Sequence, residues 1–254
     1  MQATRSDSKN NLQRIQSAMV EAGNSGADLL LTPELALAGY GTGEAICDLA
    51  QESKGEWAVQ LKQTAQETDV AVVAGFPERF NGDVFNSVYL IDASKNTNPI
   101  VHRKTYLYGD YEKGLFSHGE SKVVTMEFMG LKLGFLICYE VEFPENVRRL
   151  KLEGVDFVLV PTALAIGAYG RHIAGKVIPV RAFENQVFVA YANNSGNDSS
   201  FIYQGMSSVS APDGRTLASA PVNGSALIYA DITPSDYAKC GIDNPYLDDL
   251  RSFI

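Results

Sequence analysis

A glutamate, a lysine and a cysteine each follow an apolar or mixed run in this chain, and together they could carry out hydrolysis. Glu34 follows Leu-Leu-Leu-Thr-Pro, Lys104 follows Val-His-Arg, and Cys138 follows Gly-Phe-Leu-Ile. A thiol supplies a nucleophile, a carboxylate can take its proton and return it to a leaving amine, and an ammonium can stabilise an oxyanion. This set suits cleavage of an amide bond, provided that the fold brings the three side chains together.

Each of these residues also has an ordinary structural interpretation. A cysteine at the end of an apolar strand is usually an inert small hydrophobe. A carboxylate after a proline often stabilises the start of a helix, and a lysine beside arginine and histidine is usually solvated. Taken singly, none of the three residues therefore indicates an active site.

The elements that must position these residues follow from hydrophobic periodicity. Helices are predicted over residues 11–22, 56–68, 144–152 and 175–185, with Pro179 early in the last helix or kinking it. Apolar strand segments are predicted at 28–32, 70–74, 84–91, 100–103, 132–137, 157–160, 187–192, 206–211 and 226–230. Pro33 and Pro161 are expected to end two of them. Strands that are apolar on both faces and alternate with helices predict an α/β fold, specifically two β-sheets flanked by helices in a four-layer α-β-β-α sandwich.

Bulk properties restrict the class of protein and its partners. The chain has 254 residues and no repeat or Pro/Ser-rich linker, which predicts one domain over residues 1–254. A formal charge of −9 gives no electrostatic reason to expect nucleic acid or an anionic membrane as a partner. No apolar run approaches the ~20 residues of a membrane span, and the polar N-terminus does not resemble a signal peptide. Three scattered cysteines fit a reducing compartment, so a cytoplasmic location is expected.

Three ordered segments resemble the motifs of the nitrilase superfamily of carbon–nitrogen hydrolases. They are LLLTPELALAGY, RKTYLYGDYEKGLFSHGE and GFLICYEVEFPENVRRLKLEGVDFVLVPTA, with weaker agreement through RAFENQVFVAYANNSG and GMSSVSAPDG. The resemblance covers nearly the whole chain. It implies a Glu–Lys–Cys triad with Glu34 as the base, Lys104 as the cation and Cys138 as the nucleophile that forms a thioester.

The resemblance also implies roles for two further residues. Glu112, eight residues after Lys104, matches a second carboxylate of many members. It either holds Lys104 and orients the substrate, or forms a structural ion pair with Lys104 or Arg103, and both interpretations stay open. The backbone N–H of Tyr139 is implied as an oxyanion donor.

No cofactor or metal ion is expected. None of the three histidines lies at a metal-ligand spacing from a cysteine; they are His102, His118 and His172. Spacing alone leaves a papain-like Cys–His pair open, although packing or surface roles are favoured for the histidines. Cys47 and Cys240 lie in polar contexts and are interpreted as bystanders.

The residues after the cysteine indicate the substrate class. Members that act on carboxylate-bearing substrates often place an arginine three to five residues beyond the nucleophile, where this chain has Val141, Glu142 and Phe143. A neutral or cationic amide is therefore favoured. Tyr139 stands where many nitrilases have tryptophan, which favours an amidase over a nitrilase. A nitrilase, an N-carbamoyl amidohydrolase and a catalytically silent binding protein remain the alternatives.

Two further expectations come from the resemblance. Members are commonly homodimers or larger assemblies, so a homo-oligomer, most simply a dimer, is expected. Members also usually begin with a short apolar strand just before the position of Gln2, whereas this sequence starts at Met1. The sheet is accordingly expected to lack most of that strand, and exposed strand edges favour misassociation.

Overall fold

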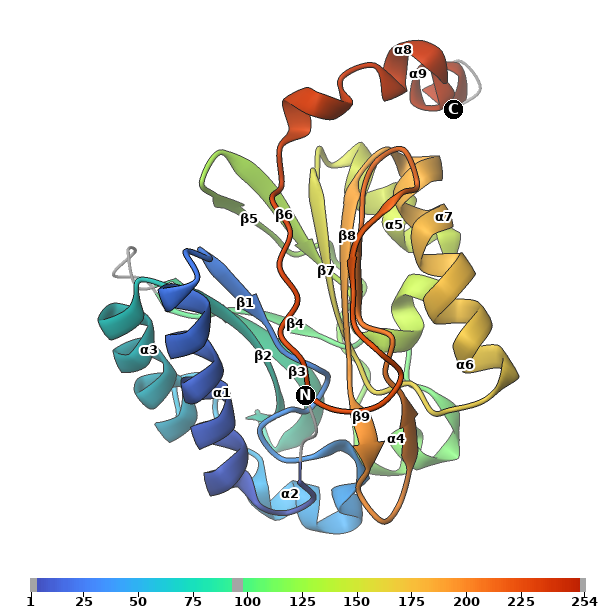
Figure 1. Cartoon of the computed structure of the whole chain (residues 1–254). Helices are drawn as coiled ribbons and strands as arrows, with labels where there is room; N and C mark the ends of the chain where they lie inside the picture. Colours follow the sequence, from blue (N-terminus) through green and yellow to red (C-terminus); the bar gives the residue numbers. More distant parts are fainter. Residues whose placement is uncertain (1–3, 93–97, 252–254) are drawn as a thin grey trace.

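Two β-sheets pack face to face and carry helices on both outer faces (Figure 1). The structure, a computed structural model, describes residues 4–92 and 98–251. The principal covering helices are α1 (Ser8–Asn24) and α3 (Glu56–Thr68) on one side and α5 (Pro144–Leu152) and α7 (Ile178–Asn185) on the other. The layer order is α-β-β-α, which confirms the predicted fold class.

The first sheet has the strand order β1-β2-β3-β4. Its strands are β1 (Leu29–Leu31), β2 (Ala71–Phe80), β3 (Asp83–Ile91) and β4 (Ile100–Arg103). β1 and β2 are parallel, whereas β2, β3 and β4 are antiparallel neighbours. Within the described residues β1 pairs only with β2, so β1 forms one edge of this sheet.

The second sheet has the strand order β12-β11-β8-β7-β6-β5. Its strands are β5 (Thr125–Phe128), β6 (Leu131–Phe135), β7 (Phe157–Thr162), β8 (Phe188–Asn193), β11 (Ser208–Ser210) and β12 (Thr216–Ser219). β6, β7 and β8 form a parallel centre, and the other neighbours are antiparallel. A separate two-stranded ribbon consists of β9 (Ser195–Asn197) and β10 (Ile202–Gln204).

Side-chain alternation along the strands produces three apolar cores. Val72 of β2 packs with α1 and α3, whereas its neighbour Val73 lies in the core between the sheets. In β7, Val158 faces α5 and α7, and Leu159 faces the first sheet. Both central strands are therefore buried on both faces, which explains why they read as continuous apolar runs.

The remaining helices are short and lie at the ends of the strands or near the C-terminus. They are the 3₁₀ helices η1 (Tyr40–Ala45), η2 (Cys138–Glu142) and η4 (Pro234–Tyr237), and the α-helices α2 (Ile46–Leu49), α4 (Gly109–Leu115), α8 (Cys240–Asp243) and α9 (Tyr246–Arg251). α8 and α9 project beyond the sheets (Figure 1), and Tyr246 packs on Phe183 of α7. No helix in the described part of the chain is long and apolar enough to cross a membrane.

β7 continues past its predicted end. The sequence predicts a strand over 157–160 that Pro161 terminates, but the strand extends to Thr162. The carbonyl of Leu159 accepts a hydrogen bond from the N–H of Leu136, so the backbone polar groups of Leu159 point toward β6. Those of Pro161, two residues later, point the same way, but β6 has already ended at Phe135. The proline therefore interrupts no ladder hydrogen bond there.

The predicted helix over 175–185 begins earlier than expected. α6 (Ala168–His172) leads through a π-helical turn, η3 (Ile173–Val177), directly into α7. Pro179 lies in the first turn of α7, immediately after the π-helical turn. A π-helical turn changes the hydrogen-bond spacing, so the chain passes Gly175 and the proline without ending the helix.

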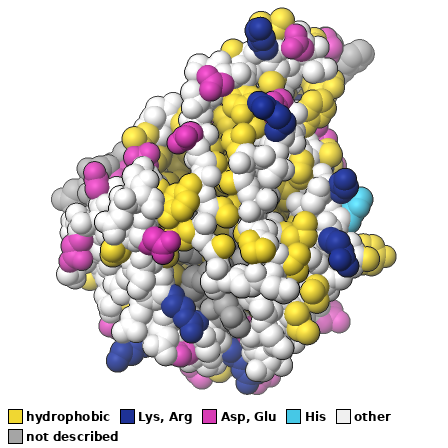
Figure 2. Space-filling view, in the orientation of Figure 1, with side chains coloured by type: hydrophobic (Ala, Val, Ile, Leu, Met, Phe, Trp, Pro, Cys, Tyr) yellow, Lys and Arg dark blue, Asp and Glu magenta, His cyan; other side chains and the backbone are white. Residues whose placement is uncertain are grey.

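The predicted strand over 226–230 is wrong, because these residues have no regular secondary structure. They run beside a groove of 1410 Å³ between β1 and the second sheet. Leu29, Leu31, Leu133 and Leu159 contribute to its apolar lining, and Figure 2 shows hydrophobic side chains gathered along the middle of this face. An apolar run forms a strand only where another backbone lies within hydrogen-bond distance, and no described strand pairs with these residues.

Gly75 on β2 allows the loop that carries Glu34 to pack directly on the strand. A Cβ atom at position 75 would lie 2.4 Å from the nitrogen of Leu35 and 2.8 Å from the carbonyl oxygen of Pro33. We expect Gly75→Ala to lower the free energy of unfolding by about 1–3 kcal/mol in urea denaturation, because strand or loop must move.

Gly114→Ala in α4 is the control for that substitution. A Cβ at position 114 would have no neighbour within 4 Å. Its stability should stay equal or rise slightly, since alanine favours helix. Equal stability of Gly75→Ala and the wild type would show that the loop does not need this close approach.

Candidate active site

The structure brings the four predicted catalytic side chains together from both sheets. Glu34 lies in the turn after β1, Lys104 directly follows β4, Glu112 lies on α4, and Cys138 begins η2 after β6. The side chains of Glu34, Lys104 and Glu112 are fully buried, and Cys138 is 9% exposed. The groove between β1 and the second sheet is a separate feature, since its lining contains none of these four residues.

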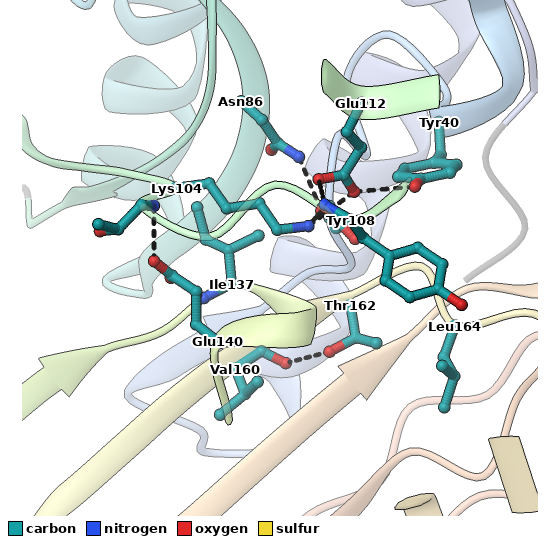
Figure 3. Close-up of polar contacts among 12 residues, drawn as sticks. Tyr40, Asn86, Lys104, Tyr108, Glu112, Ile137, Glu140, Val160, Thr162 and Leu164 are labelled. Atoms are coloured by element: carbon teal, nitrogen blue, oxygen red, sulfur yellow. Dashed lines mark hydrogen bonds and ion pairs between the residues drawn. The ribbon is translucent and has the colours of Figure 1, made fainter. Parts of the chain in front are cut away.

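Lys104 lies between two carboxylates. Its Nζ donates hydrogen bonds to Glu34 Oε1 and Glu112 Oε1, each at 2.7 Å (Figure 3). Burial by itself would lower the pKa of Lys104, but the charges of Glu34 and Glu112 outweigh it and raise that pKa. The two carboxylates therefore favour the protonated form of Lys104.

Glu34 is held through one oxygen and free at the other. Oε1 accepts hydrogen bonds from Lys104 and, at 2.7 Å, from Asn86 Nδ2, whereas Oε2 is buried without a hydrogen-bond partner among the described residues. Burial raises the pKa of Glu34, the charge of Lys104 lowers it, and Glu112 raises it, with a net increase. A carboxylate with a raised pKa and one free oxygen is suited to accept a proton.

Glu112 is fixed by two further contacts. Its Oε1 accepts a hydrogen bond from the hydroxyl of Tyr40 at 2.8 Å, and its Oε2 accepts one from the backbone N–H of Tyr108 at 2.8 Å. Of the two ion pairs considered for Glu112, only that with Lys104 is present, because Arg103 pairs with Glu78 instead. Glu112 therefore orients the ammonium, whatever else it does.

Cys138 occupies a backbone conformation that is unusual for a cysteine. Its φ is +49°, in the left-handed region, where a non-glycine residue carries about 1–3 kcal/mol of strain. The backbone N–H of Ala163 donates a hydrogen bond to its sulfur, and Glu34, Lys104 and Glu112 all act on it electrostatically. The thiol therefore lies at a sharp turn, beside the base and the cation.

The charge of Lys104 does not by itself determine the protonation state of this thiol. Burial, followed by the negative charge of Glu34, raises the pKa of Cys138 well above its usual range, and the lowering by Lys104 does not offset them. The resting nucleophile is a neutral thiol. Its proton must therefore be removed as it attacks.

The remaining sequence candidates fall outside this cluster or beside it. Tyr139 directly follows Cys138, is half-buried, and its ring contacts Tyr108 and Phe143. His102 is buried but pairs with Glu140, so it does not form a Cys–His pair with the nucleophile.

The other two histidines are exposed, at positions 118 and 172, and Cys47 and Cys240 are free, partly exposed thiols. No group of three or more His, Cys, Asp or Glu residues with metal-binding geometry occurs within residues 4–92 and 98–251.

Several residues of the site were not predicted from the sequence. They are Tyr40, Asn86, Tyr108 and Glu140. Tyr40 and Tyr108 lie inside the two motifs that carry Glu34 and Lys104, so proximity to those motifs was an available signal. Asn86 lies within a strand, and its only signal was a polar residue inside an apolar run.

Comparison with known proteins assigns the family. The sequence profile described as "Carbon-nitrogen hydrolase" matches residues 1–241. The chain therefore belongs to the carbon–nitrogen hydrolase family, the nitrilase superfamily that the motifs resemble.

Among its relatives, the chain is 43% identical to a Pseudomonas protegens protein named "Hydrolase in pqqF 5'region", over 96% of this chain and 85% of that protein. It is 33% identical to an (R)-stereoselective amidase of a Pseudomonas species, over 84% of this chain and 76% of that one.

A solved structure shares the fold. The amidase from Nesterenkonia sp. AN1 superposes with a TM-score of 0.84 at 31% identity, covering 100% of this chain and 96% of that one. A variant of that amidase shows covalent addition of the acetamide moiety of fluoroacetamide at its active-site cysteine. In that relative, the cysteine is therefore a nucleophile.

The charge arrangement predicts how Glu34 affects thiol reactivity. If Glu34 removes the thiol proton during attack, Glu34→Gln should slow alkylation of Cys138 by iodoacetamide at pH 7 by roughly 10²-fold. If the thiol instead ionised in a prior equilibrium without Glu34 as base, removing the negative charge of Glu34 would lower the thiol pKa, increase the thiolate fraction and speed alkylation. The two routes thus give opposite signs. Rates are measured by mass spectrometry in a Cys47→Ser/Cys240→Ser background, and urea-unfolded samples should react equally.

Proposed function

We propose that this chain is an amidase that hydrolyses a non-peptide amide to an acid and ammonia through a thioester on Cys138. The observation that carries the proposal is the buried set of Glu34, Lys104 and Glu112, which acts electrostatically on a strained thiol. The covalent adduct on the cysteine of the Nesterenkonia amidase supports the same role for Cys138.

Acylation uses the free oxygen of Glu34. As Sγ of Cys138 attacks the amide carbon, Glu34 Oε2 takes the thiol proton, and the carbonyl electrons move to oxygen. The ammonium of Lys104 and the backbone N–H of Tyr139 stabilise this oxyanion, and loss of one such donor typically costs about 3–4 kcal/mol. When the carbonyl re-forms, the carbon–nitrogen bond breaks, Glu34 gives its proton to the nitrogen, and ammonia leaves.

Deacylation reverses the roles of the same groups. Glu34 takes a proton from water while the water oxygen attacks the thioester carbon. The carbon–sulfur bond then breaks, and the departing sulfur recovers the proton from Glu34. Glu112 keeps the ammonium of Lys104 in place through both steps, because it holds Nζ at 2.7 Å and is itself tied to Tyr40.

A neutral or cationic amide is the proposed substrate class. The half-buried carboxyl of Glu142 lies close enough to the site to interact electrostatically with Lys104, and burial raises its pKa. The arginine beneath this turn, Arg181, is already engaged: it donates to the carbonyls of Val141 and Glu142 and pairs with Glu184 at 2.9 Å. An anionic substrate would therefore meet Glu142, and the guanidinium of Arg181 that lies nearest to this turn already has partners.

A row of aromatic rings beside the nucleophile supports the same substrate class. Tyr106 stacks on Phe143 at 4.7 Å, Phe143 contacts Tyr139 at 4.9 Å, and Tyr139 contacts Tyr108 at 5.1 Å. Aromatic faces attract apolar groups and cations. Variants of the Nesterenkonia amidase bind butyramide and acrylamide, which are small neutral amides.

The cellular setting and assembly are also proposals. A cytoplasmic location fits the three free cysteines and the charge of −9, and a homodimer is the assembly that the family resemblance favours. Residues 1–254 are proposed to act as one catalytic domain, because both sheets contribute to one site.

Replacement of the nucleophile tests the proposal. Cys138→Ala and Cys138→Ser should abolish ammonia release from small neutral amides such as butyramide. Intact-protein mass spectrometry of the wild type should show an acyl adduct that maps to Cys138. Cys240→Ser removes a free thiol outside the site and should keep full activity. Undiminished turnover by Cys138→Ala would refute the thioester route.

The same assay separates the alternative functions. Acid formed from nitriles with higher kcat/KM than from amides would make the chain a nitrilase. Preference for N-carbamoyl amino acids would make it an N-carbamoyl amidohydrolase. No adduct and no turnover with amides, nitriles and carbamoyl compounds would indicate a catalytically silent binding protein.

The hydrogen bond from Asn86 is one of the contacts that act on the pKa of Glu34. The hydrogen bond from Asn86 lowers the pKa of Glu34, so Asn86→Ala should raise it further. Because a protonated Glu34 accepts no proton, the acidic limb of the kcat/KM profile should move to higher pH in this variant. A limb that stays in place or moves to lower pH would assign it to another group.

A further inference from the structure

Glu140 links two segments of the site that come from different sheets. Its carboxylate is 1% exposed. Oε2 accepts a hydrogen bond from the backbone N–H of Ile137 at 2.6 Å and lies 2.8 Å from Nε2 of His102. Oε1 accepts a hydrogen bond from the backbone N–H of Thr105 at 2.7 Å.

These contacts flank the reactive residues. Ile137 directly precedes Cys138, and Thr105 directly follows Lys104. Lys104 is placed by β4 of the first sheet, whereas Cys138 is placed by β6 of the second sheet. One carboxylate therefore connects the backbone next to the nucleophile with the backbone next to the ammonium, across the contact between the two sheets.

Helix capping explains only part of this arrangement. The bond from the N–H of Ile137 to the side chain of Glu140 caps the start of η2. Capping requires neither the bond from Thr105 nor the contact with His102, which reach residues 35 and 38 positions away along the chain. The additional contacts both go to the segment around Lys104, at His102 and Thr105.

The protein maintains this carboxylate in its ionised form. Burial raises the pKa of Glu140, but His102 and the two backbone N–H groups outweigh burial and lower it. An anion that accepts from two backbone N–H groups and faces an imidazole forms stronger and more directional contacts than a neutral group does.

We propose that Glu140 is a positioning residue that fixes the distance and orientation of Cys138 relative to Lys104 and Glu34. The proposal rests on the proposed amidase function, since it concerns how the same site is assembled. Glu140 does not touch the substrate and takes no proton in the reaction. It acts through Ile137 and Thr105.

The proposal requires a carboxylate at this position. A glutamine of the same shape presents one oxygen and one NH₂ group, and the NH₂ group cannot accept a hydrogen bond. In either orientation of Glu140→Gln, one of the backbone N–H groups of Ile137 and Thr105 loses its partner. Only one of the two hydrogen bonds that join the segments of Cys138 and Lys104 through residue 140 then remains.

Steady-state kinetics and hydrogen exchange test this role. Glu140→Gln should lower kcat and kcat/KM by a similar factor of roughly 10–100, because a misplaced nucleophile weakens the transition state more than substrate binding. Rates are normalised to the fraction of protein that forms an acyl adduct, so unfolded protein does not contribute. Amide hydrogen exchange at Ile137 or Thr105 should be faster than in the wild type.

Glu78→Gln is the matched control. Glu78 is also 1% exposed and pairs with Arg103 at 2.7 Å, but among the described residues its carboxylate accepts hydrogen bonds only from the side chains of Ser87 and Arg103. It should lose stability while its normalised kcat remains near that of the wild type. If Glu140→Gln keeps wild-type normalised kcat, or loses no more than Glu78→Gln does, the positioning role is wrong.

A second variant keeps the test decisive if Glu140→Gln does not fold. Glu140→Asp keeps the negative charge but shortens the side chain by one methylene, so it should lose reach to one of the two backbone N–H groups and lower normalised kcat by a smaller factor. Wild-type normalised kcat together with faster amide exchange at Ile137 or Thr105 would overturn the proposal. Failure of the amidase function appears separately, as activity that survives Cys138→Ala. Hydrogen exchange then still reports whether Glu140 holds the two segments together.

Discussion

An ammonium with no exposed surface lies between two equally buried carboxylates, and the site is organised around this charge. Removing an ion from water is costly, so Lys104 is tolerated only because Glu34 and Glu112 both contact it at 2.7 Å. Breaking such a buried pair typically costs about 3–5 kcal/mol. The same cost favours this geometry, because each carboxylate contacts the ammonium directly and offsets the loss of water.

The same charges and the same burial also determine the protonation state of the Cys138 thiol. Two carboxylates and one ammonium leave a net negative surrounding, and together with burial this keeps Cys138 protonated. A neutral thiol requires a base when it attacks a substrate. In the proposed mechanism the free oxygen of Glu34 is that base, and the left-handed backbone at Cys138 places the sulfur at the turn.

The sandwich of two sheets decides whether these groups meet. Glu34 and Lys104 are placed by the first sheet and Cys138 by the second, so their separation depends on contacts that cross between the sheets. Some of these contacts are apolar, as in the core that contains Val73 and Leu159. Others are polar and local, such as the bonds of Glu140 to Thr105 and Ile137. Apolar packing determines the distance between the two sheets, whereas hydrogen bonds orient the segments that carry Lys104 and Cys138.

The sequence by itself determined the layers and the reactive residues. Periodicity located α3 and β4 at their observed bounds, and three motifs identified Glu34, Lys104 and Cys138, because each of these signals is local in the chain. It failed at residues 226–230, where strand formation depends on a distant neighbour, and at Pro161, where the neighbouring strand has ended.

Only the tertiary structure decided the state of the site. The neutral thiol, the free oxygen of Glu34 and the contacts of Asn86 and Glu140 all result from burial and from partners more than thirty residues away in the chain. Desolvation depends on everything packed around a group, and sequence spacing contains no such information.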